Sequence, residues 1–177
     1  FFSRLNNGDH QLKANNSFLV ELIEDAFVSL KGKAKDKDIA LTYSDQTDGR
    51  ELYAERKLIL DALSRLTDNA IKFSPQGAEV KLSALLLADG SAVLAVRDNG
   101  PGIAMHTLER CMKPFAQADE ALTRSEQGLG LGLAISKLIA EMHGGKLVVD
   151  GKPDIGTTAS IWMPAKNVLI ERAQRAG

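Results

Sequence analysis

Hydrophobic residues recur at a helical spacing in three segments of the chain. Residues 17–36 place large apolar side chains three or four positions apart, and Ser17 stands where an N-cap would be. Residues 56–73 repeat this spacing and end at the helix-stopping sequence SPQG, and residues 131–142 repeat it again before Gly144. The pattern therefore predicts three amphipathic helices.

Shorter segments alternate apolar and polar residues, as strands do. DIALTY and RELYAE flank the turn-rich SDQTDG, which predicts a hairpin. VKLSALLL and SAVLAVRD flank Asp89 and Gly90, a pair typical of hairpin turns, and KLVVD and TTASIWMP flank PDIG. The fold class expected from this order is an α/β two-layer sandwich, in which a mixed, mainly antiparallel sheet packs on about three helices.

One segment does not follow either period. A short helical piece is expected around residues 106–112, and a polar stretch extends to about residue 127. Connections longer than about 12 residues within a compact domain are usually functional or disordered. The segment from about residue 104 to residue 127 is therefore a candidate for a functional loop.

Composition and charge narrow the possible partners. The chain has 177 residues, 44% of them hydrophobic and 25% charged, which fits one ordinary globular domain. Lys and Arg number 22 against 23 Asp and Glu, so nothing suggests nucleic acid or an anionic membrane as the main partner. Any phosphate binding must be local. The opening residues read as the end of a helix, so we expect a piece of a longer protein.

Two further features bear on the cellular compartment. Cys111 is the single cysteine, which excludes an intramolecular disulfide and a cysteine-rich zinc site and fits a reducing compartment. No apolar run approaches the roughly 18 residues that a membrane span requires, and no signal-peptide pattern opens the chain. We expect a cytoplasmic piece without direct membrane contact, although its parent could be membrane-anchored.

Asp98 is the first residue of a candidate site, in the sequence DNGPGIAM. It shares strand parity with Leu94 and Val96, so its carboxylate should point inward, where an unpartnered charge is costly. Gly100 and Gly102 would let the backbone approach a ligand closely. The alternative is that Asp98 merely caps a turn through its own backbone, as Asx residues often do.

A second candidate is GLGLGLAISK, residues 128–137, in which three glycines lead into a helix. Such a junction exposes backbone N–H groups and the positive end of the helix, which suits phosphate oxygens. The spacing fits neither a Walker lysine motif nor a dinucleotide-binding turn. A flexible hinge is the alternative interpretation.

The predicted helix 56–73 carries the third candidate. Arg65, Asp68, Asn69 and Lys72 follow one another at helical spacing and share a face. An asparagine can offer an uncharged oxygen to Mg²⁺, and a lysine can meet a phosphate. A solvated helix face is the simpler interpretation of the same four residues.

Taken together and in order, these motifs point to a known family. TDNAIKF, DNGPGI, KPFAQ, GLGLGLAISK and GTTASIWMP resemble the catalytic, ATP-binding domain of bacterial sensor histidine kinases. That domain belongs to a wider ATPase group with DNA gyrase, heat-shock chaperones and mismatch-repair proteins. The resemblance implies the Bergerat-type ATP-binding fold over residues 17–165. Residues 1–16 would end a dimerisation helix and linker, and residues 166–177 would form a C-terminal tail.

The resemblance also implies roles for individual residues. The carboxylate of Asp98 would accept a hydrogen bond from the adenine amino group, with Thr157 sharing a bound water. Asn69 would coordinate Mg²⁺ and Lys72 would contact phosphate, which makes these two the expected catalytic residues. The other expected nucleotide-binding residues are Phe73, Gly100, Gly102, Ile103, Phe115, Gly128, Leu129, Gly130, Leu131 and Gly132.

In such kinases Phe73 would lie beside adenine, Phe115 would belong to a mobile lid over about residues 104–127, and the glycines of GLGLG would form a loop whose amides hold phosphate. The implied function is that of a protein histidine kinase in two-component signal transduction. It would bind Mg-ATP and donate the γ-phosphate to a histidine on a dimerisation domain absent from this chain. The implied partners are that domain, a response regulator and a second copy of the parent.

The chain's own histidines do not fit the acceptor motif, in which an acidic residue follows the histidine. We therefore expect structural roles for His10, His106 and His143, with His143 at a helix end where a cation would be favourable. This piece alone is expected not to phosphorylate itself.

Arg65 departs from the family pattern, which usually has another asparagine there. It could add a phosphate contact, or it could crowd the metal. The alternative function is therefore a degenerate nucleotide-binding or scaffolding domain without phosphotransfer. Hydrolytic relatives tend to place a general-base glutamate at this position, so ATP hydrolysis is a weaker third possibility.

Overall fold

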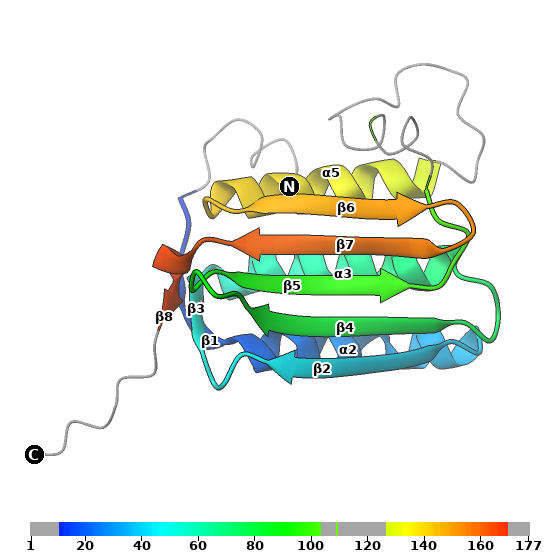
Figure 1. The fold of residues 1–177 in the computed structure, drawn as a ribbon, viewed down its shortest axis with the longest axis horizontal. Coiled ribbons are helices and arrows are strands. Elements are labelled where there is room, and N and C mark those ends of the chain that lie inside the picture. Colours follow the sequence, from blue (N-terminus) through cyan, green and yellow to red (C-terminus); the bar gives the residue numbers. More distant parts are fainter. Residues whose placement is uncertain (1–10, 104–108, 110–126, 170–177) are drawn as a thin grey trace, which may run out of the picture.

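The central sheet has five strands, and its order differs from the order of the chain. The computed structural model describes residues 11–103, 109 and 127–169. The strands lie in the order β2, β4, β5, β7, β6, with one parallel pair, β2 with β4, and antiparallel pairing elsewhere. Their bounds are β2 Ala40–Gln46, β4 Glu79–Leu86, β5 Ala92–Asp98, β6 Lys146–Lys152 and β7 Gly156–Met163 (Figure 1).

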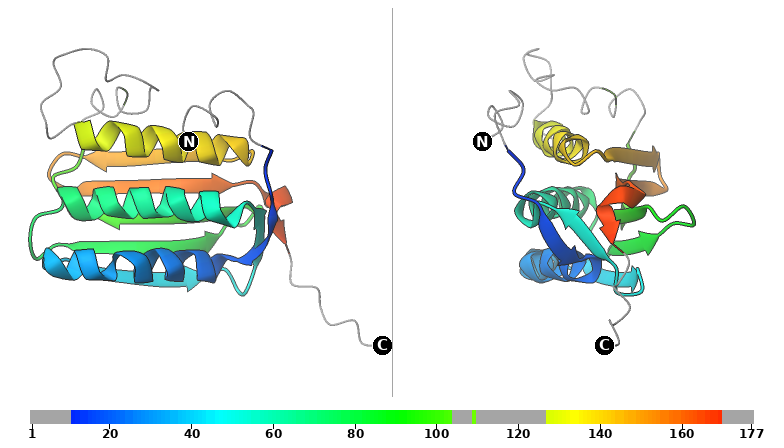
Figure 2. Two further views of the ribbon diagram at one scale, coloured as in Figure 1. Left: turned by 180° about the vertical axis from the view of Figure 1, so that it is seen from behind. Right: turned by 90° about the vertical axis from the view of Figure 1, so that its left-hand side faces the viewer.

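Helices cover one face of this sheet. They are α2 Leu19–Asp36, α3 Arg56–Phe73 and α5 Gln127–Met142, and they lie side by side in front of the strands in the left view of Figure 2. The apolar stripe of α3, including Ile59, Leu63 and Leu66, is buried between sheet and neighbouring helices, as its spacing predicts. The expected two-layer sandwich with a mixed sheet is therefore confirmed.

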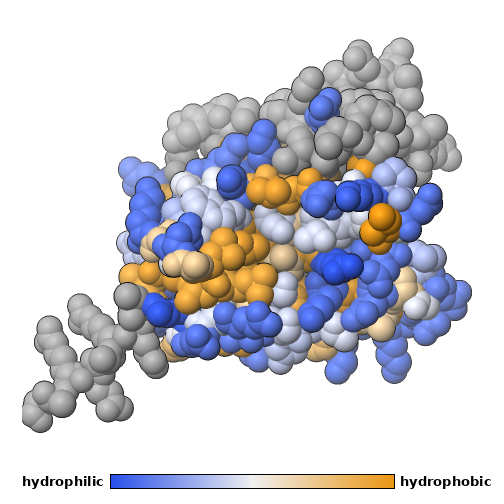
Figure 3. Space-filling view, viewed as in Figure 1, coloured by the Kyte–Doolittle hydropathy of each residue, from blue (hydrophilic) through white to orange (hydrophobic). Residues whose placement is uncertain are grey.

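No helix among the described residues covers the opposite face of the sheet. Figure 3 shows this face, where hydrophobic and hydrophilic side chains are intermixed over the strands. Val148 on β6 is 46% exposed, and Trp162 on β7 donates a hydrogen bond from its indole nitrogen to Ser91 Oγ at 3.0 Å. The two predicted hairpins that join β4 to β5 and β6 to β7 are confirmed.

The predicted hairpin over residues 38–55 is wrong. β2 pairs in parallel with β4, whereas β3, Glu51–Ala54, joins a second sheet with β1, Asn15–Phe18, and β8, Val168–Leu169. Asp45 accepts hydrogen bonds from both the backbone N–H and the hydroxyl of Thr47, in a local turn that leads the chain out of the sheet. Leu41 of β2 lies in register with the buried Val80 of β4, a long-range pairing that local turn residues do not encode.

The first helix begins one residue later than an N-cap at Ser17 predicts, at Leu19 with Phe18 as the N-cap. Ser17 lies in β1 opposite Leu52 and faces inward, and Phe18 precedes the helix without a side-chain cap. The first backbone N–H of the helix instead has a partner outside the helix, because Leu19 N donates to Arg50 O at 3.0 Å. Pairing of β1 with β3 therefore outweighs the capping preference of Ser17.

His143 has the structural role expected of it, but not as a cation. The ring is 5% exposed, and its Nε2 accepts a hydrogen bond from Glu55 N at 3.0 Å. Nδ1 lies 2.7 Å from Ile139 O and donates to it. A backbone N–H can only donate to an unprotonated nitrogen, so the ring is neutral with its proton on Nδ1.

The 3₁₀ helix Ala165–Asn167 packs against the end of α5, since Asn167 Nδ2 donates to His143 O at 2.9 Å. His10 and His106 lie outside the described residues.

Candidate functional site

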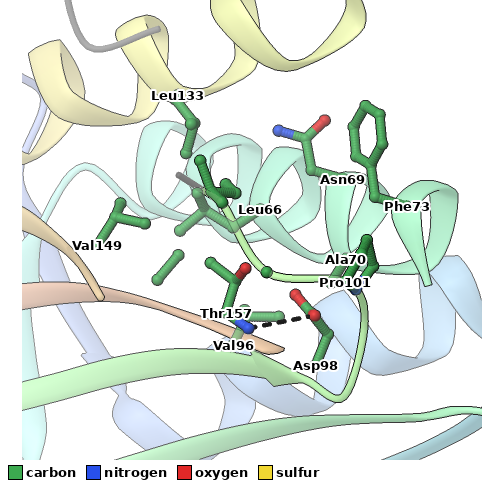
Figure 4. Close-up of a pocket in the computed structure, with 13 residues that line it drawn as sticks. Leu66, Asn69, Ala70, Phe73, Val96, Asp98, Pro101, Leu133, Val149 and Thr157 are labelled. Carbon is green, nitrogen blue, oxygen red and sulfur yellow. Dashed lines mark hydrogen bonds between the residues drawn. The ribbon is translucent and has the colours of Figure 1, made fainter. Parts of the chain in front are cut away.

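A pocket opens between α3, the N-terminal half of α5 and the ends of β5 and β7. It gathers several of the residues that the sequence singles out, and Figure 4 shows them converging from these elements. Its described lining residues are Leu66, Asn69, Ala70, Phe73, Val96, Asp98, Pro101, Gly102, Ile103, Leu133, Val149, Thr157 and Ala159. Most of these are apolar, and Asp98 is the only charged residue among them.

Asp98 is the last residue of β5 and is half-buried, with its carboxyl group directed from the sheet toward α3 (Figure 4). It pairs in register with Thr157, the second residue of β7. Its Oδ1 accepts hydrogen bonds from Gly100 N at 2.8 Å and Thr157 N at 3.3 Å. The expected turn cap and the expected pocket position are therefore both present, because one oxygen caps the turn while the group as a whole lines the pocket.

The electrostatic state of Asp98 reflects this environment. Desolvation by the surrounding apolar walls raises the pKa of the carboxyl above its ordinary value. The two backbone N–H groups, of Gly100 and Thr157, lower the pKa and so offset part of that rise. A partly desolvated acceptor of this kind gains most from a ligand that brings its own hydrogen-bond donor.

Glycines allow the backbone to fold tightly around this carboxylate. A Cβ on Gly102 would lie 2.0 Å from Lys152 O, and the φ of Gly102 is +75°. A Cβ on Gly156, which the motif analysis did not select, would lie 2.1 Å from Asp98 O, with a φ of +123°. Both positions therefore require glycine sterically.

Asn69 faces the same pocket from α3. Its Nδ2 is buried, and no described residue provides a partner for it. A Cβ on Gly132 would lie 3.0 Å from this atom, so the absence of a side chain there makes room for the amide. A buried polar atom without a partner is uncommon in proteins and is expected where a ligand completes its hydrogen bonds.

The glycine-rich segment is helical rather than a loop. α5 begins at Gln127, so Gly128, Leu129, Gly130 and Gly132 lie in its first turns, and the expected loop is wrong in this respect. Packing of α5 against α3, with Leu133 buried between them, outweighs the poor helix propensity of glycine. Leu131 is 47% exposed and is not among the pocket-lining residues. Residues 104–108 and 110–126, which include Phe115 and most of the expected lid and of the short helix expected around residues 106–112, lie outside the described residues.

Lys72 and Phe73 end α3 at the mouth of the pocket. Phe73 lines the pocket, whereas Lys72 lines an adjoining open groove with Phe73 and Gly100. The Lys72 ammonium lies 5.2 Å from the centre of the Phe73 ring, within cation–π range. Lys72 is thus beside the pocket and does not reach into it.

Arg65 does not line the pocket. Its Nε donates to Asp61 Oδ2 at 2.9 Å, one turn closer to the start of α3, and both side chains are about one-third exposed, at 33%. The groove that contains Arg65 is formed by Asp61, Leu58 and the residues around the start of α3. The guanidinium is therefore directed away from Asn69.

The apolar walls of the pocket were missed by the motif analysis. Leu66 and Ala70 flank Asn69 on the inner face of α3, and Val96 and Ala159 lie two residues from Asp98 and Thr157 on their strands. These four residues could have been identified from the sequence, because residues at helical spacing from Asn69, or two positions from Asp98 and Thr157 on a strand, lie on the same face. Val149 on β6 and Leu133 on α5 required knowledge of the tertiary packing.

Comparison with known proteins agrees with this geometry. A family model described as histidine kinase-, DNA gyrase B-, and HSP90-like ATPase matches residues 54–167. The chain belongs to this ATPase family. No helix within the described part of this ATPase domain has the length and apolar character needed to cross a bilayer.

Curated relatives of the domain are much longer proteins. The non-motile and phage-resistance protein of Caulobacter vibrioides is 33% identical over 168 residues, which is 93% of this chain and 20% of that protein. The sensor-like histidine kinase SenX3 of Mycolicibacterium smegmatis is 33% identical over 143 residues, 81% of this chain and 37% of that one. The domain therefore spans less than two-fifths of the length of either relative.

Solved structures share the fold. The catalytic domain of histidine kinase ThkA is 25% identical, with a TM-score of 0.74 over 86% of this chain and 96% of that one. Full-length ShkA, solved in complex with AMPPNP, is 25% identical, with a TM-score of 0.79 over 92% of this chain and 33% of that one. The domain thus has the α/β sandwich of histidine kinase catalytic domains, whose family is associated with ATP binding and kinase activity.

Proposed function

We propose that this domain binds Mg-ATP and donates the γ-phosphate to a histidine on a dimerisation domain of a two-component sensor kinase. The observation that carries the proposal is Asp98, a half-buried carboxylate held by two backbone N–H groups at the end of a mainly apolar pocket. An adenine ring fits this chemistry, because it combines an apolar surface with an exocyclic N–H donor.

The metal assignment rests on Asn69. Mg²⁺ prefers oxygen ligands, keeps several waters and takes much of its shell from the phosphates of a bound nucleotide. The buried Nδ2 of Asn69 has no partner among the described residues, and exchanging the nitrogen and oxygen of the amide would place its oxygen at that position instead. The residues present therefore fit a nucleotide-borne Mg²⁺, which would neutralise phosphate charge during transfer.

The protein's share of the chemistry would be positioning and charge neutralisation. Phosphoryl transfer depends mainly on alignment of donor and acceptor and on electrostatic stabilisation of the phosphoryl oxygens. Lys72, at the mouth of the pocket, would leave the Phe73 ring to contact a phosphate. The nucleophile would be the acceptor histidine of the other domain, since His143 is buried and hydrogen-bonded through both ring nitrogens.

Phosphotransfer between separately purified parts tests this function. The domain is mixed with its parent's dimerisation domain, γ-labelled ATP and Mg²⁺, and acid-labile, base-stable label on the acceptor is measured. We expect labelling by the wild-type domain, and loss of it with Asn69→Ala or with the acceptor histidine changed to glutamine. ATP binding without any labelling would instead support the scaffolding alternative.

Arg65 gives the sharpest test of that alternative. Because its guanidinium pairs with Asp61 outside the pocket lining, Arg65→Asn should change the affinity for Mg-ATP by less than about twofold, the scale of an exposed ion pair. Calorimetric titration of both proteins measures this. Binding that appears only after the substitution would mean that Arg65 blocks the metal and that the domain is degenerate.

The wider setting is proposed by likeness to the relatives. The parent would form a homodimer, act in the cytoplasm and pass its phosphoryl group to a response regulator. A solved complex of ThkA with the response regulator TrrA is among the structural matches, at 22% identity, which supports the fold comparison.

A further inference from the structure

The end of α3 carries much of the proposed phosphate and metal site, yet its last backbone carbonyls have no partners within the helix. Asn69, Lys72 and Phe73 all lie in its final turn and a half, and Ser74 follows as C-cap. The Ser74 N–H closes the helix on Ala70 O at 3.1 Å. The following carbonyls, of Ile71 and Lys72, need donors from elsewhere.

Lys37 supplies these donors from another helix. It is the C-cap residue of α2, and its Nζ donates to Ile71 O at 2.9 Å and to Lys72 O at 2.5 Å. A cation at this place also opposes the partial negative charge at the C-terminal end of α3. One side chain therefore donates to two otherwise unpartnered carbonyls and also places a positive charge at the negative end of the helix dipole.

The neighbouring turn of α2 makes a second contact of the same kind. Lys33, four residues before Lys37, forms an ion pair with Asp68, the residue that precedes Asn69. This pair is exposed, and such pairs contribute little energy individually. It joins the same two helices one turn before the Lys37 contacts.

We propose that Lys37 is a positioning residue for the phosphate and metal end of the site. Lys37 also lines the open groove that contains Lys72, but its ammonium donates there to the Ile71 and Lys72 carbonyls, so it acts by holding the backbone of the turn that presents Asn69 and Lys72. This inference rests on the proposed function, since it concerns the geometry of Mg-ATP binding. The base end is independent of Lys37, because Asp98 and Thr157 are fixed by pairing of β5 with β7.

The domain should fold without the Lys37 ammonium. The connections that follow α2 and α3 are joined by backbone hydrogen bonds, from Gly77 N to Asp38 O at 2.8 Å and from Ala40 N to Ala78 O at 2.9 Å. Leu22, Ile23 and Ala26 of α2 are buried in the core. Loss of the cap therefore removes a local restraint on α3 rather than the packing of α2.

Three variants separate positioning from charge. Lys37→Met keeps the length of the side chain and removes its donors, whereas Lys37→Arg keeps a donating cation. Lys35→Met is the matched control, because Lys35 is in the last turn of the same helix and has no hydrogen bond or ion pair to α3 among the described side chains. Affinities for Mg-ATP and for adenosine are measured by calorimetry at a temperature at which circular dichroism shows every variant folded.

We expect Lys37→Met to weaken Mg-ATP binding about tenfold, the scale of one charged hydrogen bond, and adenosine binding less than about twofold. Lys37→Arg should restore most of the Mg-ATP affinity, and Lys35→Met should match wild type. Equal losses for both ligands, an unchanged Mg-ATP affinity, or an equal effect of Lys35→Met would overturn the inference. If the wild-type domain binds neither ligand, it is the proposed function that fails.

Discussion

The two ends of the pocket are built in different ways. At the base end, Asp98 and Thr157 sit opposite each other on paired strands, and backbone N–H groups already hold the carboxylate. At the phosphate end, Asn69 has a buried nitrogen without a described partner, and the adjacent turn depends on a lysine from α2. The base end is therefore held in place by backbone hydrogen bonds, whereas the phosphate end has a buried group without a described partner.

This difference follows from the elements that form each end. Strand pairing fixes side chains through a ladder of backbone bonds, so a residue in mid-sheet has little freedom. A helix end has unsatisfied carbonyls and can shift more easily. We therefore expect the sheet to recognise the base, and the end of α3 to bind the phosphates and the metal.

The largest effect is expected from Gly102→Ala, which breaks the base end. The new Cβ would meet Lys152 O at 2.0 Å in a backbone with positive φ, so the loop beside Asp98 must move. We expect a loss of about 3 kcal/mol in the free energy of unfolding, together with loss of detectable ATP binding. Chemical denaturation and calorimetry measure the two quantities.

Gly77→Ala is the matched control for that variant. Gly77 has a similar φ of +79°, but a Cβ there meets nothing within 4 Å. Gly77→Ala should therefore lower the free energy of unfolding by only about 1 kcal/mol, from backbone strain alone, and leave ATP binding intact. Equal costs at the two positions would show that the close approach of Gly102 to β6 does not matter.

Asp98→Asn tests the base end without changing its shape. The amide oxygen can still accept from Gly100 N and Thr157 N, but the charged acceptor for the adenine amino group is gone. We expect ATP and adenosine affinities to fall together, by about 10- to 100-fold. Titration with both ligands measures this, and a selective loss for ATP alone would place Asp98 at the wrong end of the ligand.

Asn69→Ala tests the phosphate end. Affinity for Mg-ATP should fall about tenfold, adenosine binding should be unchanged, and the benefit of adding Mg²⁺ should disappear. The free energy of unfolding should change by less than about 1 kcal/mol, because the lost amide nitrogen has no described partner. Retention of the Mg²⁺ effect in this variant would refute the metal assignment.

The pH dependence of stability should distinguish Asp98 from an exposed carboxylate. Desolvation raises its folded-state pKa above the unfolded value, so the protonated form is the one that folding favours. Its contribution is thus fully present below the unfolded pKa and is lost as pH rises through the folded pKa. We expect the stability of Asp98→Asn relative to wild type to increase as the pH rises above about 4, the ordinary aspartate pKa. Chemical denaturation of both proteins at several pH values measures this. A difference in the free energy of unfolding that does not change with pH would contradict the expectation.

The local pattern of apolar and polar residues was sufficient to predict several elements correctly. The helix at 56–73, the two hairpins and the inward direction of Asp98 are confirmed by the structure. Each depends on parity or on turn chemistry within a few residues.

Long-range pairing could not be read in the same way. The parallel register of β2 with β4, and the use of β3 in a second sheet, are decided by distant partners. The helical start of α5 at a run of glycines likewise depends on packing against α3. The apolar walls around Asp98 and Asn69 come from five separate elements, α3, α5, β5, β6 and β7, which only the fold brings together.

Calorimetric titration of the wild-type domain with Mg-ATP, with ATP in the presence of a chelator, and with adenosine tests the central claim most directly. The account predicts that all three bind at one site, that adenosine and Mg²⁺-free ATP bind more weakly, and that Mg²⁺ adds affinity only when phosphates are present. Absence of adenosine binding, or an ATP affinity indifferent to Mg²⁺, would contradict a preformed base end joined to a ligand-completed phosphate end.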